Sequence, residues 1–566
     1  MRVLGLNGWP GRGHDASACL VEDGRLIALA EEERFTRRKH AYGAAPVHAA
    51  AFCLDRAGIT LDDVDAVAFG WDVPLLYRDR GIPYPFTDRT ALELLLPARE
   101  LPRRRDPQLV FVPHHVAHAA SVFHLSGDKR AAILVVDGQG ERESTSLAVG
   151  ERGKISVIDS FPPAWSLGYF YDAVGRYIGL GPDQAGKTMG LAAYGRTGDA
   201  SFGSFAMESD FAVAHLPADL MSRRNIDDSE EVIDGWLAHL ERTCPLPPNT
   251  LRRRWDSRTA RFSSVPDRDP FDYADIAATA QAAIEHLVSG FVDSVVRLTG
   301  EETLHVAGGV ALNATLNGRL LHHPALRRVF VQPLAGDAGV ALGAALHLCA
   351  EAGHPGAPMG AHLAWGPEFS PGAVRDVVTA SGLRFDEPGD LPSAVADLIA
   401  DGRTVGWFQG RAEAGPRALG QRSILADPGA RETRDRLNLR IKRREWWRPL
   451  APSVTSEEAP EHLETPVPLP YMVTTVPLRP EARARFEAVD HVDGTTRAQT
   501  VEAAEQPLYH ELLRRVGERS GASLLLNTSF NGNEEPLVNS PADALSAYAR
   551  LGLDALAIGP FLLRKR

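Results

Sequence analysis

The chain has 566 residues, 44% hydrophobic and 24% charged, which is ordinary for a globular protein of several compact units. Its formal net charge of −12 argues against broad nucleic-acid binding and suits a neutral or cationic small partner. No apolar run approaches the roughly 20 residues that cross a bilayer, and four scattered cysteines indicate reduced thiols in the cytoplasm.

The first part of the chain is predicted to alternate strands and helices. A strand over 3–8 and a hairpin turning at Asp23-Gly24 come first. The elements that follow are a helix over 45–58, strands over 65–70 and 109–112, a helix over 114–125 and a strand over 131–137.

A similar order then recurs. We expect strands over 143–149 and 154–161, a helix over 166–178, a long helix over 273–298, a strand over 303–309, a helix over 313–321, a strand over 327–333 and a helix over 339–351. Two such halves resemble the duplicated fold of actin-like ATPases and sugar kinases. A polar, irregular stretch over about 197–270 reads as an insertion.

A Gly/Pro-rich stretch over 352–372 is the best domain boundary. We therefore expect two domains, residues 1–355 and 372–566, the second a separate α/β unit. Its predicted parts are a strand over 404–410, the loop 414–423, a basic helix, a strand over 523–530 and a final helix and strand. Residues 431–448 contain eight Lys or Arg, either a solvated helix face or a wall for phosphate.

Two histidines and two aspartates have the spacing of metal ligands. His114 and His118 are one helical turn apart, and Asp137 and Asp337 each end a predicted strand, where ligand-binding residues of α/β sheets gather. This set suits Fe(II), Mn(II) or Mg(II) better than structural zinc. The alternative is two core histidines and two aspartates that cap helices.

Other motifs indicate a nucleotide site. Gly308-Gly309 lies between a strand and a helix, where backbone N–H groups can face phosphate, and Asn313 can cap the helix or bind a ribose. His14 follows a Gly-rich turn and is either a base for a hydroxyl group or a turn histidine. Lys39 can reach a phosphate or belong to a solvated basic run.

In the C-terminal part, several cations occupy tight Gly/Pro or Thr contexts. They are Arg417, Lys442, Arg448 and Arg497. Forked guanidinium groups suit a small dianion. Asn527 and Ser529 end a predicted strand in a polar turn. The alternative is a set of surface arginines and an ordinary turn.

Taken together, these motifs resemble the O-carbamoyltransferases of the nodulation and cephem type. The segments that carry the resemblance are HDASACL, AEEERFTRRKH, HHVAHAAS, VVDGQGE, GGVALN, GPRALGQRSI, RPLAPS and LLNTSFNG. The N-terminal segment and residues 68–72 look most like the branch that carbamoylates aminoglycosides. The resemblance implies a duplicated actin-like (ASKHA) N-terminal domain and a YrdC-like C-terminal α/β domain.

The resemblance also implies an ATP-dependent, two-step enzyme. The C-terminal domain makes carbamoyl adenylate from carbamoyl phosphate and ATP, and the N-terminal domain passes the carbamoyl group to a hydroxyl of a small sugar-containing acceptor, an aminoglycoside-like antibiotic. The implied general base is His14. The implied ligands of a divalent metal, Fe(II) with Mn(II) or Mg(II) as alternatives, are His114, His118, Asp137 and Asp337. The implied nucleotide contacts in the N-terminal domain are Lys39, Gly168, Gly309 and Asn313. The implied contacts of carbamoyl phosphate and ATP in the C-terminal domain are Arg417, Arg448, Arg497, Asn527 and Ser529, with Lys442 as an addition.

The acceptor is less well defined by the sequence. Arg12 stands where the aminoglycoside branch carries an acidic contact, and it would repel a polyamine. Glu141 and Asp228 are the candidates to receive a cationic amino sugar. A neutral macrolide, ansamycin or nucleoside sugar stays open.

Two other functions compete with antibiotic carbamoylation. One is threonylcarbamoylation of tRNA, which would require a threonine pocket and a basic surface; the net charge argues against it. The other is a nucleotide-binding scaffold without chemistry, against which the presence of His14, His118, Asp137 and Arg417 counts. We expect neither a nucleic-acid nor a membrane partner, and the sequence does not indicate an oligomeric state.

Overall fold

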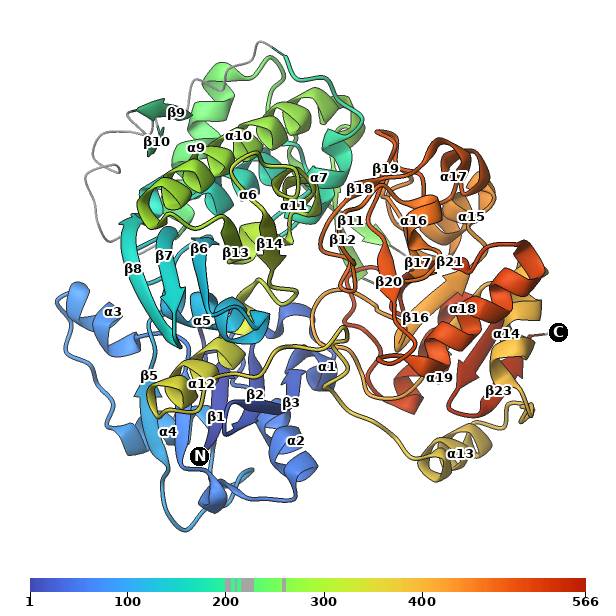
Figure 1. Ribbon diagram of the computed structural model, residues 1–566, viewed down its shortest axis with the longest axis horizontal. Helices are drawn as coiled ribbons and strands as arrows, with labels where there is room; N and C mark the ends of the chain where they lie inside the picture. The colour runs from blue at the N-terminus through green and yellow to red at the C-terminus, as the bar shows by residue number, and fades with distance from the viewer. Residues whose placement is uncertain (199–204, 209–210, 215–228, 257–260, 566) are drawn as a thin grey trace. The chain divides into compact units, whose positions relative to one another are not determined.

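The computed structural model spans residues 1–566 and describes all of them except 199–204, 209–210, 215–228, 257–260 and 566 (Figure 1). The chain divides into two compact units. Unit 1 comprises Met1–Gly70, Phe86–Val110 and Asp337–Arg566, and unit 2 comprises Trp71–Pro85 and Phe111–Gly336. The boundary expected at 352–372 lies within unit 1, and the domains 1–355 and 372–566 stay a prediction.

The first sheet has the order β3-β2-β1-β4-β5. Its strands are β1 (Arg2–Asn7), β2 (Ser17–Glu22), β3 (Arg25–Glu31), β4 (Ala66–Phe69) and β5 (Gln108–Phe111). Strand β1 is antiparallel to β2 and parallel to β4, with Gly5 opposite Cys19 and Ala68. A Cβ on Gly5 would lie 2.0 Å from the carbonyl oxygen of Ala341, so helix α12 (Val340–Glu351) packs directly on this strand.

The second sheet repeats this arrangement within unit 2. It has the order β14-β13-β6-β7-β8. Its strands are β6 (Arg130–Val136), β7 (Thr145–Glu151), β8 (Lys154–Phe161), β13 (Thr303–Ala307) and β14 (Arg328–Val331). Strand β6 is antiparallel to β7 and parallel to β13, as β1 is to β2 and β4. The shared order confirms the predicted α/β repeat.

Five further helices of the two halves lie at predicted positions: α2 (Val47–Ala57), α5 (His114–Ser126), α6 (Leu167–Tyr177), α10 (Ala274–Thr299) and α11 (Ala314–Leu320). The structure adds helices that the sequence pattern did not predict: α1 (Glu33–Thr36), α3 (Val73–Asp79), α4 (Asp88–Leu95), α7 (Ala185–Ala192) and α9 (Ser229–Thr243). Gly58 and Gly300, both with positive φ, end α2 and α10. Among the described residues, no helix is long and apolar enough to span a membrane.

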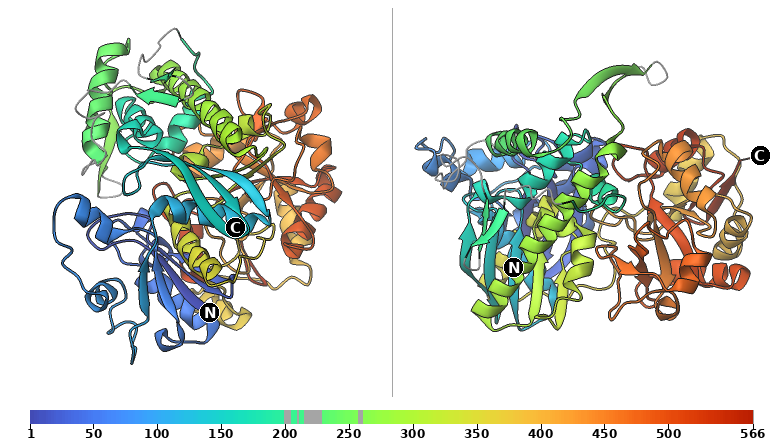
Figure 2. Two further views of the ribbon diagram at one scale, coloured as in Figure 1. Left: turned by 60° about the vertical axis from the view of Figure 1, so that its left-hand side comes forward. Right: turned by 90° about the horizontal axis from the view of Figure 1, so that it is seen from above.

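The expected irregular insertion contains regular structure in its described part. Strand β9 (Phe205–Glu208) pairs with β10 (Phe211–Ala214), and β11 (Leu251–Asp256) pairs with β12 (Arg261–Pro266). Figure 2 shows the β11–β12 hairpin extending away from the rest of unit 2. The strand with sequence LRRRWD lacks a clear apolar face because a two-stranded hairpin buries little surface, so its pattern did not predict a strand.

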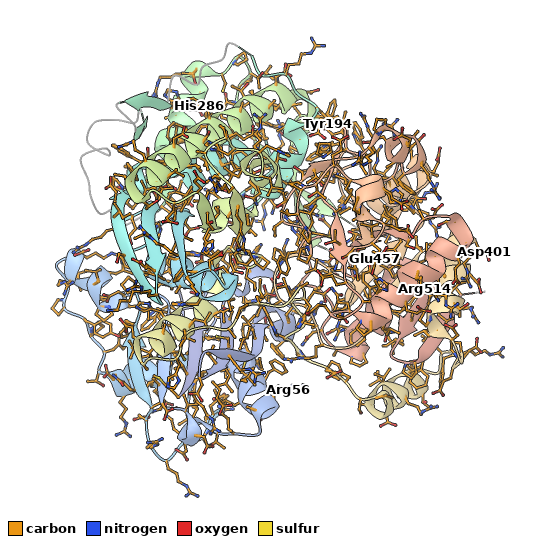
Figure 3. The ribbon with its side chains drawn as sticks, viewed as in Figure 1. Arg56, Tyr194, His286, Asp401, Glu457 and Arg514 are labelled. Carbon is orange, nitrogen blue, oxygen red and sulfur yellow. The ribbon has the colours of Figure 1, made fainter. Side chains whose placement is uncertain are left out.

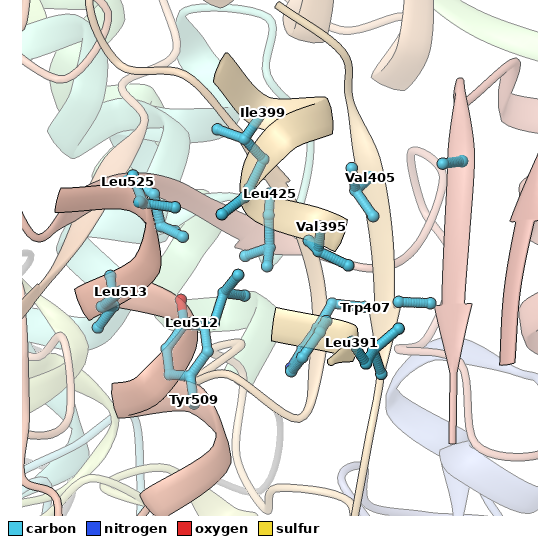
Figure 4. Close-up of a cluster of buried hydrophobic side chains, with 14 of the residues drawn as sticks. Leu391, Val395, Ile399, Val405, Trp407, Leu425, Tyr509, Leu512, Leu513 and Leu525 are labelled. Carbon is cyan, nitrogen blue, oxygen red and sulfur yellow. The ribbon is translucent and has the colours of Figure 1, made fainter. Parts of the chain in front are cut away.

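A seven-stranded sheet organises the C-terminal part of unit 1, in the order β20-β17-β21-β16-β15-β22-β23. The strands are β15 (Val405–Phe408), β16 (Arg422–Ala426), β17 (Ala451–Thr455), β20 (Gln499–Val501), β21 (Leu524–Ser529), β22 (Ala555–Ile558) and β23 (Phe561–Arg564), beside the short pair β18 (Val476–Pro477) and β19 (Thr495–Thr496). The helices are α13 (Pro371–Ala380), α14 (Leu391–Ala400), α15 (Arg431–Asp435), α16 (Ala459–His462), α17 (Pro480–Arg485), α18 (Pro507–Ser520) and α19 (Pro541–Leu551). Figure 4 shows Trp407 and Leu425 of the sheet in a buried cluster with Val395 of α14 and Leu512 of α18.

The basic helix is shorter than the sequence suggests. Helix α15 continues as a π-helix over Arg436–Lys442, and Arg443 ends it with a φ of 50°. Arg444 and Arg448 therefore lie in the following loop rather than on a helix face. π-Helical turns are rare and frequently mark functional sites.

Candidate active-site residues

Helix α5 begins at His114, and a carboxylate fixes its first turn. Glu141 accepts hydrogen bonds from the backbone N–H groups of His114 (3.0 Å) and Asp72 (2.6 Å). These N–H groups would otherwise be unsatisfied at a helix start. Glu141 is 4% exposed, and burial raises its pKa. This buried capping position does not favour the predicted contact between Glu141 and an acceptor.

The two histidines of α5 converge on Asp137. The Nε2 atoms of His114 and His118 lie 3.1 Å apart, and Asp137 Oδ2 lies 3.2 Å and 3.6 Å from them. Burial disfavours the charged carboxylate, but its hydrogen bonds with both histidines outweigh this and hold the pKa of Asp137 well below its ordinary value.

This group has the chemistry of a metal site. His114, His118, Asp137 and Asp337 each offer one ligand atom, and these atoms all lie within 4.8 Å of one another. Asp337 is bonded to Gly336, the last residue of unit 2. If both Nε2 atoms carried a hydrogen, or if neither did, the two rings would repel each other at this distance. A divalent ion can instead accept a lone pair from each nitrogen. The donor set therefore fits a divalent metal ion.

Glycines surround the other side of Asp137. Gly309 donates its N–H to Asp137 Oδ1 at 2.7 Å, and a Cβ on Gly309 would lie 2.9 Å from that oxygen. Gly308 has a φ of +91°, and its Cβ would lie 2.3 Å from the carbonyl oxygen of Val136. A Cβ on Gly168 would lie 2.9 Å from the carbonyl oxygen of Asp137. Gly168 and Gly309 thus allow close packing around Asp137, and their predicted nucleotide contacts stay a prediction.

Asn313 occupies the N-cap of α11. Its side chain accepts the N–H of Leu316 at 3.0 Å and donates to Gln281 at 2.9 Å. The capping role weighed from the sequence is therefore present in the structure. Its 8% exposure leaves little surface for a ribose, and that contact stays a prediction.

The remaining N-terminal candidates belong to unit 1. The His14 side chain is 48% exposed, with Nδ1 lying 3.0 Å from Asp15 Oδ2. Arg12 and Lys39 are exposed. Asp228 lies outside the described residues.

Five cations form a cluster in the C-terminal part of unit 1. They are Arg417, Lys442, Arg444, Arg448 and Arg497. Burial, then repulsion by Arg448, lowers the pKa of Arg417 to about 10, and burial, then repulsion by three of the other arginines, holds the pKa of Arg497 well below its ordinary range. The Nε atoms of Arg417 and Arg497 are buried without a hydrogen-bond partner among the described residues. Such a cluster favours a bound anion.

A neutral amide and a carboxylate that accepts backbone N–H groups hold the segments of this cluster in place. Asn438, in the π-helix, donates to the carbonyl of Arg448 at 2.9 Å and accepts from Arg444 Nε at 2.8 Å. Glu413, 2% exposed, accepts the N–H groups of the loop that follows Arg417: Leu419, Gln421 and Arg422.

The predicted residues of strand β21 lie against the same cluster. Lys442 Nζ donates to the carbonyl (2.6 Å) and hydroxyl (2.9 Å) oxygens of Ser529 and to Asn531 Oδ1 (3.0 Å). Asn527, 2% exposed, donates to the carbonyl of Ala418, next to Arg417. The structure thus gives Asn527 a supporting position, and its predicted ligand contact stays a prediction.

Sequence reasoning missed two members of this site. Arg444 belongs to the basic run over 431–448, so its charge was a usable signal. Asn438 gave no signal, because a lone asparagine in a helix is usually solvated or neutral in its effect.

The sequence is similar to those of known proteins. The family model described as carbamoyltransferase N-terminus matches residues 2–79 and 83–346, and the one described as carbamoyltransferase C-terminus matches 396–565. Nodulation protein NolNO of Sinorhizobium fredii is 38% identical over 98% of this chain and 79% of its own length. The 3'-hydroxymethylcephem-O-carbamoyltransferase of Amycolatopsis lactamdurans is 36% identical over 45% of this chain and 48% of its own length.

A comparison of structures adds little to this. An activator of 2-hydroxyisocaproyl-CoA dehydratase from Clostridium difficile covers 62% of this chain and 96% of its own, at 13% identity and a TM-score of 0.32. That score supports no argument. The two family models, however, together cover most of the sequence, and they agree with the predicted resemblance. The chain belongs to the carbamoyltransferase family, of the nodulation and cephem type, and is a transferase enzyme.

Proposed function

We propose that this carbamoyltransferase uses carbamoyl phosphate and ATP to form carbamoyl adenylate, and then carbamoylates a hydroxyl of an antibiotic sugar of the aminoglycoside-like class. The observation that carries the proposal is the cluster of five cations around Arg417 and Arg497. Like charges that are partly buried together destabilise a folded protein unless an anion joins them. Carbamoyl phosphate and the triphosphate of ATP are such anions.

The first step belongs to the C-terminal part, which we propose to be a YrdC-like domain over 372–566. Carbamoyl phosphate, ATP and water give carbamoyl adenylate, phosphate and pyrophosphate. The guanidinium groups bind the phosphate oxygens, and their forked N–H groups match that geometry. Lys442, at the end of the π-helix, donates hydrogen bonds to Ser529, which supports a shared role of these two residues in binding the anion.

The second step belongs to the N-terminal domain, which we propose to be actin-like and to span residues 1–355. His14 takes the proton of the acceptor hydroxyl, the hydroxyl oxygen bonds to the carbamoyl carbon, and AMP leaves. Lys39, Gly168, Gly309 and Asn313 are the proposed nucleotide contacts. His114, His118, Asp137 and Asp337 would hold a divalent metal, Fe(II) or alternatively Mn(II) or Mg(II), which would supply Lewis acidity when bound.

Two observations bear on the acceptor. The name of the Amycolatopsis relative describes a hydroxymethyl acceptor on a small antibiotic, which agrees with a small hydroxyl acceptor here. The exposed Arg12 disfavours a polycation. An acceptor panel should therefore contain aminoglycosides beside neutral macrolide, ansamycin and nucleoside sugars.

The test is to incubate the purified protein with carbamoyl phosphate, ATP, Fe(II) and this panel, following pyrophosphate and a product heavier by one carbamoyl group. Arg448→Met should raise the KM for carbamoyl phosphate about 10- to 100-fold, because a hydrogen bond to a charged group contributes about 1.5–3 kcal/mol. Arg443→Met is the matched control, since Arg443 is exposed in the same loop, and it should behave as wild type. Absence of pyrophosphate under all conditions would refute the proposal.

A further inference from the structure

Residues 11–15 and 40–43 of unit 1 are joined by backbone hydrogen bonds on either side of His14. Gly11 N–H donates to the carbonyl of Gly43 (3.0 Å), Gly43 N–H donates to that of Gly13 (3.0 Å), and Asp15 N–H donates to that of His40 (2.6 Å). Asp15 and His40 have φ values of +51° and +61°. A non-glycine residue in this region costs about 1–3 kcal/mol, and such strain tends to cluster at active sites.

The strained backbone places one carboxylate between two imidazole rings. Asp15 Oδ2 lies 3.0 Å from His14 Nδ1, and Asp15 Oδ1 lies 2.8 Å from His40 Nδ1. The backbone N–H of His40 donates to Glu33 Oε2 at 2.7 Å. Asn7, 1% exposed, donates to the carbonyls of His14 and Asp15 at 3.2 and 3.1 Å. The backbones of His14 and His40, whose rings flank the carboxylate, are therefore also held by hydrogen bonds.

The two histidines differ in exposure. The His14 side chain is 48% exposed, whereas those of Asp15 and His40 are each 29% exposed. An imidazole whose Nδ1–H donates to a carboxylate keeps its lone pair on Nε2. His14 is thus the member of the group that can meet a substrate.

The electrostatics agree with this division of roles. Burial opposes charge on His40, but its hydrogen bond to Asp15 outweighs burial and raises the pKa of His40. Burial likewise opposes charge on Asp15, and the hydrogen bonds from both histidines hold the pKa of Asp15 well below its ordinary value. The other charged groups acting on His40 are Lys39 and Glu33.

We infer that Asp15 and His40 are positioning residues for His14. Asp15 fixes the Nδ1–H tautomer and the orientation of the His14 ring, so that Nε2 receives the proton of the acceptor hydroxyl. The carboxylate then stabilises the His14 imidazolium, which returns its proton to solvent after AMP leaves. His40 binds the second carboxylate oxygen and keeps Asp15 aimed at His14. This inference rests on the proposed role of His14 as the base.

The kinetic test compares Asp15→Asn and His40→Gln with wild type at saturating carbamoyl phosphate and ATP. Asparagine tolerates the left-handed φ at position 15, so the first variant should fold. It should lower kcat for transfer about 10²- to 10⁴-fold, the usual contribution of general base catalysis, with the acceptor KM nearly unchanged. His40→Gln should lower kcat in the same sense but less. The control is Glu457→Gln, which breaks the 3.0 Å pair of Glu457 with His510 (Glu457 is labelled in Figure 3) and should leave kcat unchanged.

A spectroscopic test does not depend on turnover. Protein with ¹⁵N-labelled histidine, at a pH above the ordinary histidine pKa of about 6.5, should show an Nδ1–H tautomer that disappears in His14→Asn. Asp15→Asn should move that signal toward the Nε2–H form, because the amide can donate to Nδ1. A wild-type kcat in Asp15→Asn, or an Nε2–H tautomer in the wild type, would overturn the inference. If no acceptor is carbamoylated by the wild type, the proposed function fails, and the tautomer still decides the positioning role.

Discussion

Replacing Gly309 by alanine should weaken metal binding without breaking the fold. A Cβ at this position would lie 2.9 Å from Asp137 Oδ1, whereas ordinary contacts begin at 3.4 Å, so the carboxylate must move by 3.4 − 2.9, or about 0.5 Å. The φ of Gly309 is not in the left-handed region, so its backbone accepts alanine. The perturbation therefore falls on Asp137 rather than on the chain path.

The size of the effect follows from the geometry of the site. Asp137 Oδ2 lies 3.2 Å from His114 Nε2, and a shift of about 0.5 Å exceeds the roughly 0.2 Å by which metal–ligand distances vary. Disturbing a group that orients a ligand typically costs about 10- to 100-fold in metal affinity. This corresponds to about 1.4–2.8 kcal/mol of binding free energy.

The assay titrates metal-free protein with Mn(II) and measures the binding affinity by calorimetry. Thermal unfolding of the same samples reports their stability. The matched control is Gly186→Ala in helix α7, where a Cβ meets nothing within 4 Å. That control should keep the wild-type Mn(II) affinity and gain up to about 1 kcal/mol of stability, because alanine favours helix. Equal Mn(II) affinity in the two variants would show that Gly309 does not set the position of Asp137, and the reasoning would fail.

Two stability predictions follow from a buried arginine in unit 1 and a half-buried glutamate in unit 2. Arg34, with a side chain 7% exposed, pairs with Glu31 and donates to the carbonyl of Gly415 at 2.7 Å. Arg34→Met should therefore cost about 3–5 kcal/mol in denaturant unfolding, and adding Glu31→Gln should recover part of it; a loss below about 1 kcal/mol would contradict the prediction. In unit 2, burial, then the charge of Glu141, raises the pKa of Glu143 from its ordinary 4.5 to about 7. The folded state then holds a proton that the unfolded state releases, so this contribution to stability is full below pH 4.5 and is lost as the pH rises through about 7. The melting temperature of metal-free Glu143→Gln should fall less steeply than that of wild type as the pH rises from 4.5 to about 7. Parallel curves for the two proteins would contradict the raised pKa of Glu143.

Local signals in the sequence were sufficient for the strands of the two five-stranded sheets and for the long helix α10. The long helix was predicted over 273–298 and is Ala274–Thr299, because an apolar periodicity ends at a glycine that can take a positive φ. Strand β8 was predicted at its observed bounds, 154–161. The repeat of strand order was also predictable, since each half alternates strands and helices in one sequence order. These features depend on residues close together in the chain.

The site was predictable only where its members share a local motif. His114 and His118 lie one turn apart, so their common face follows from helix geometry. Asp15 and His40 are 25 residues apart and meet because both adopt a left-handed backbone that composition does not predict for these residue types. The charge of Glu141 predicts an acceptor contact, whereas the structure shows its carboxylate buried against the backbone N–H groups at the start of α5, and the acceptor contact stays a prediction.

The cationic cluster shows why such sites are hard to predict from pairing rules. A search for partners of opposite charge would pass over it, since Glu413 Oε1 accepts backbone N–H groups and Asn438 is neutral. Among the described residues, Glu445 lies 3.7 Å from Arg448 and Glu535 acts on Lys442, so acidic groups are fewer than the five cations. The scaffold therefore fixes the positions of the arginines without cancelling their charge. That combination destabilises the free protein and leaves favourable electrostatic free energy for a bound anion, which is what the proposed binding of carbamoyl phosphate and ATP requires.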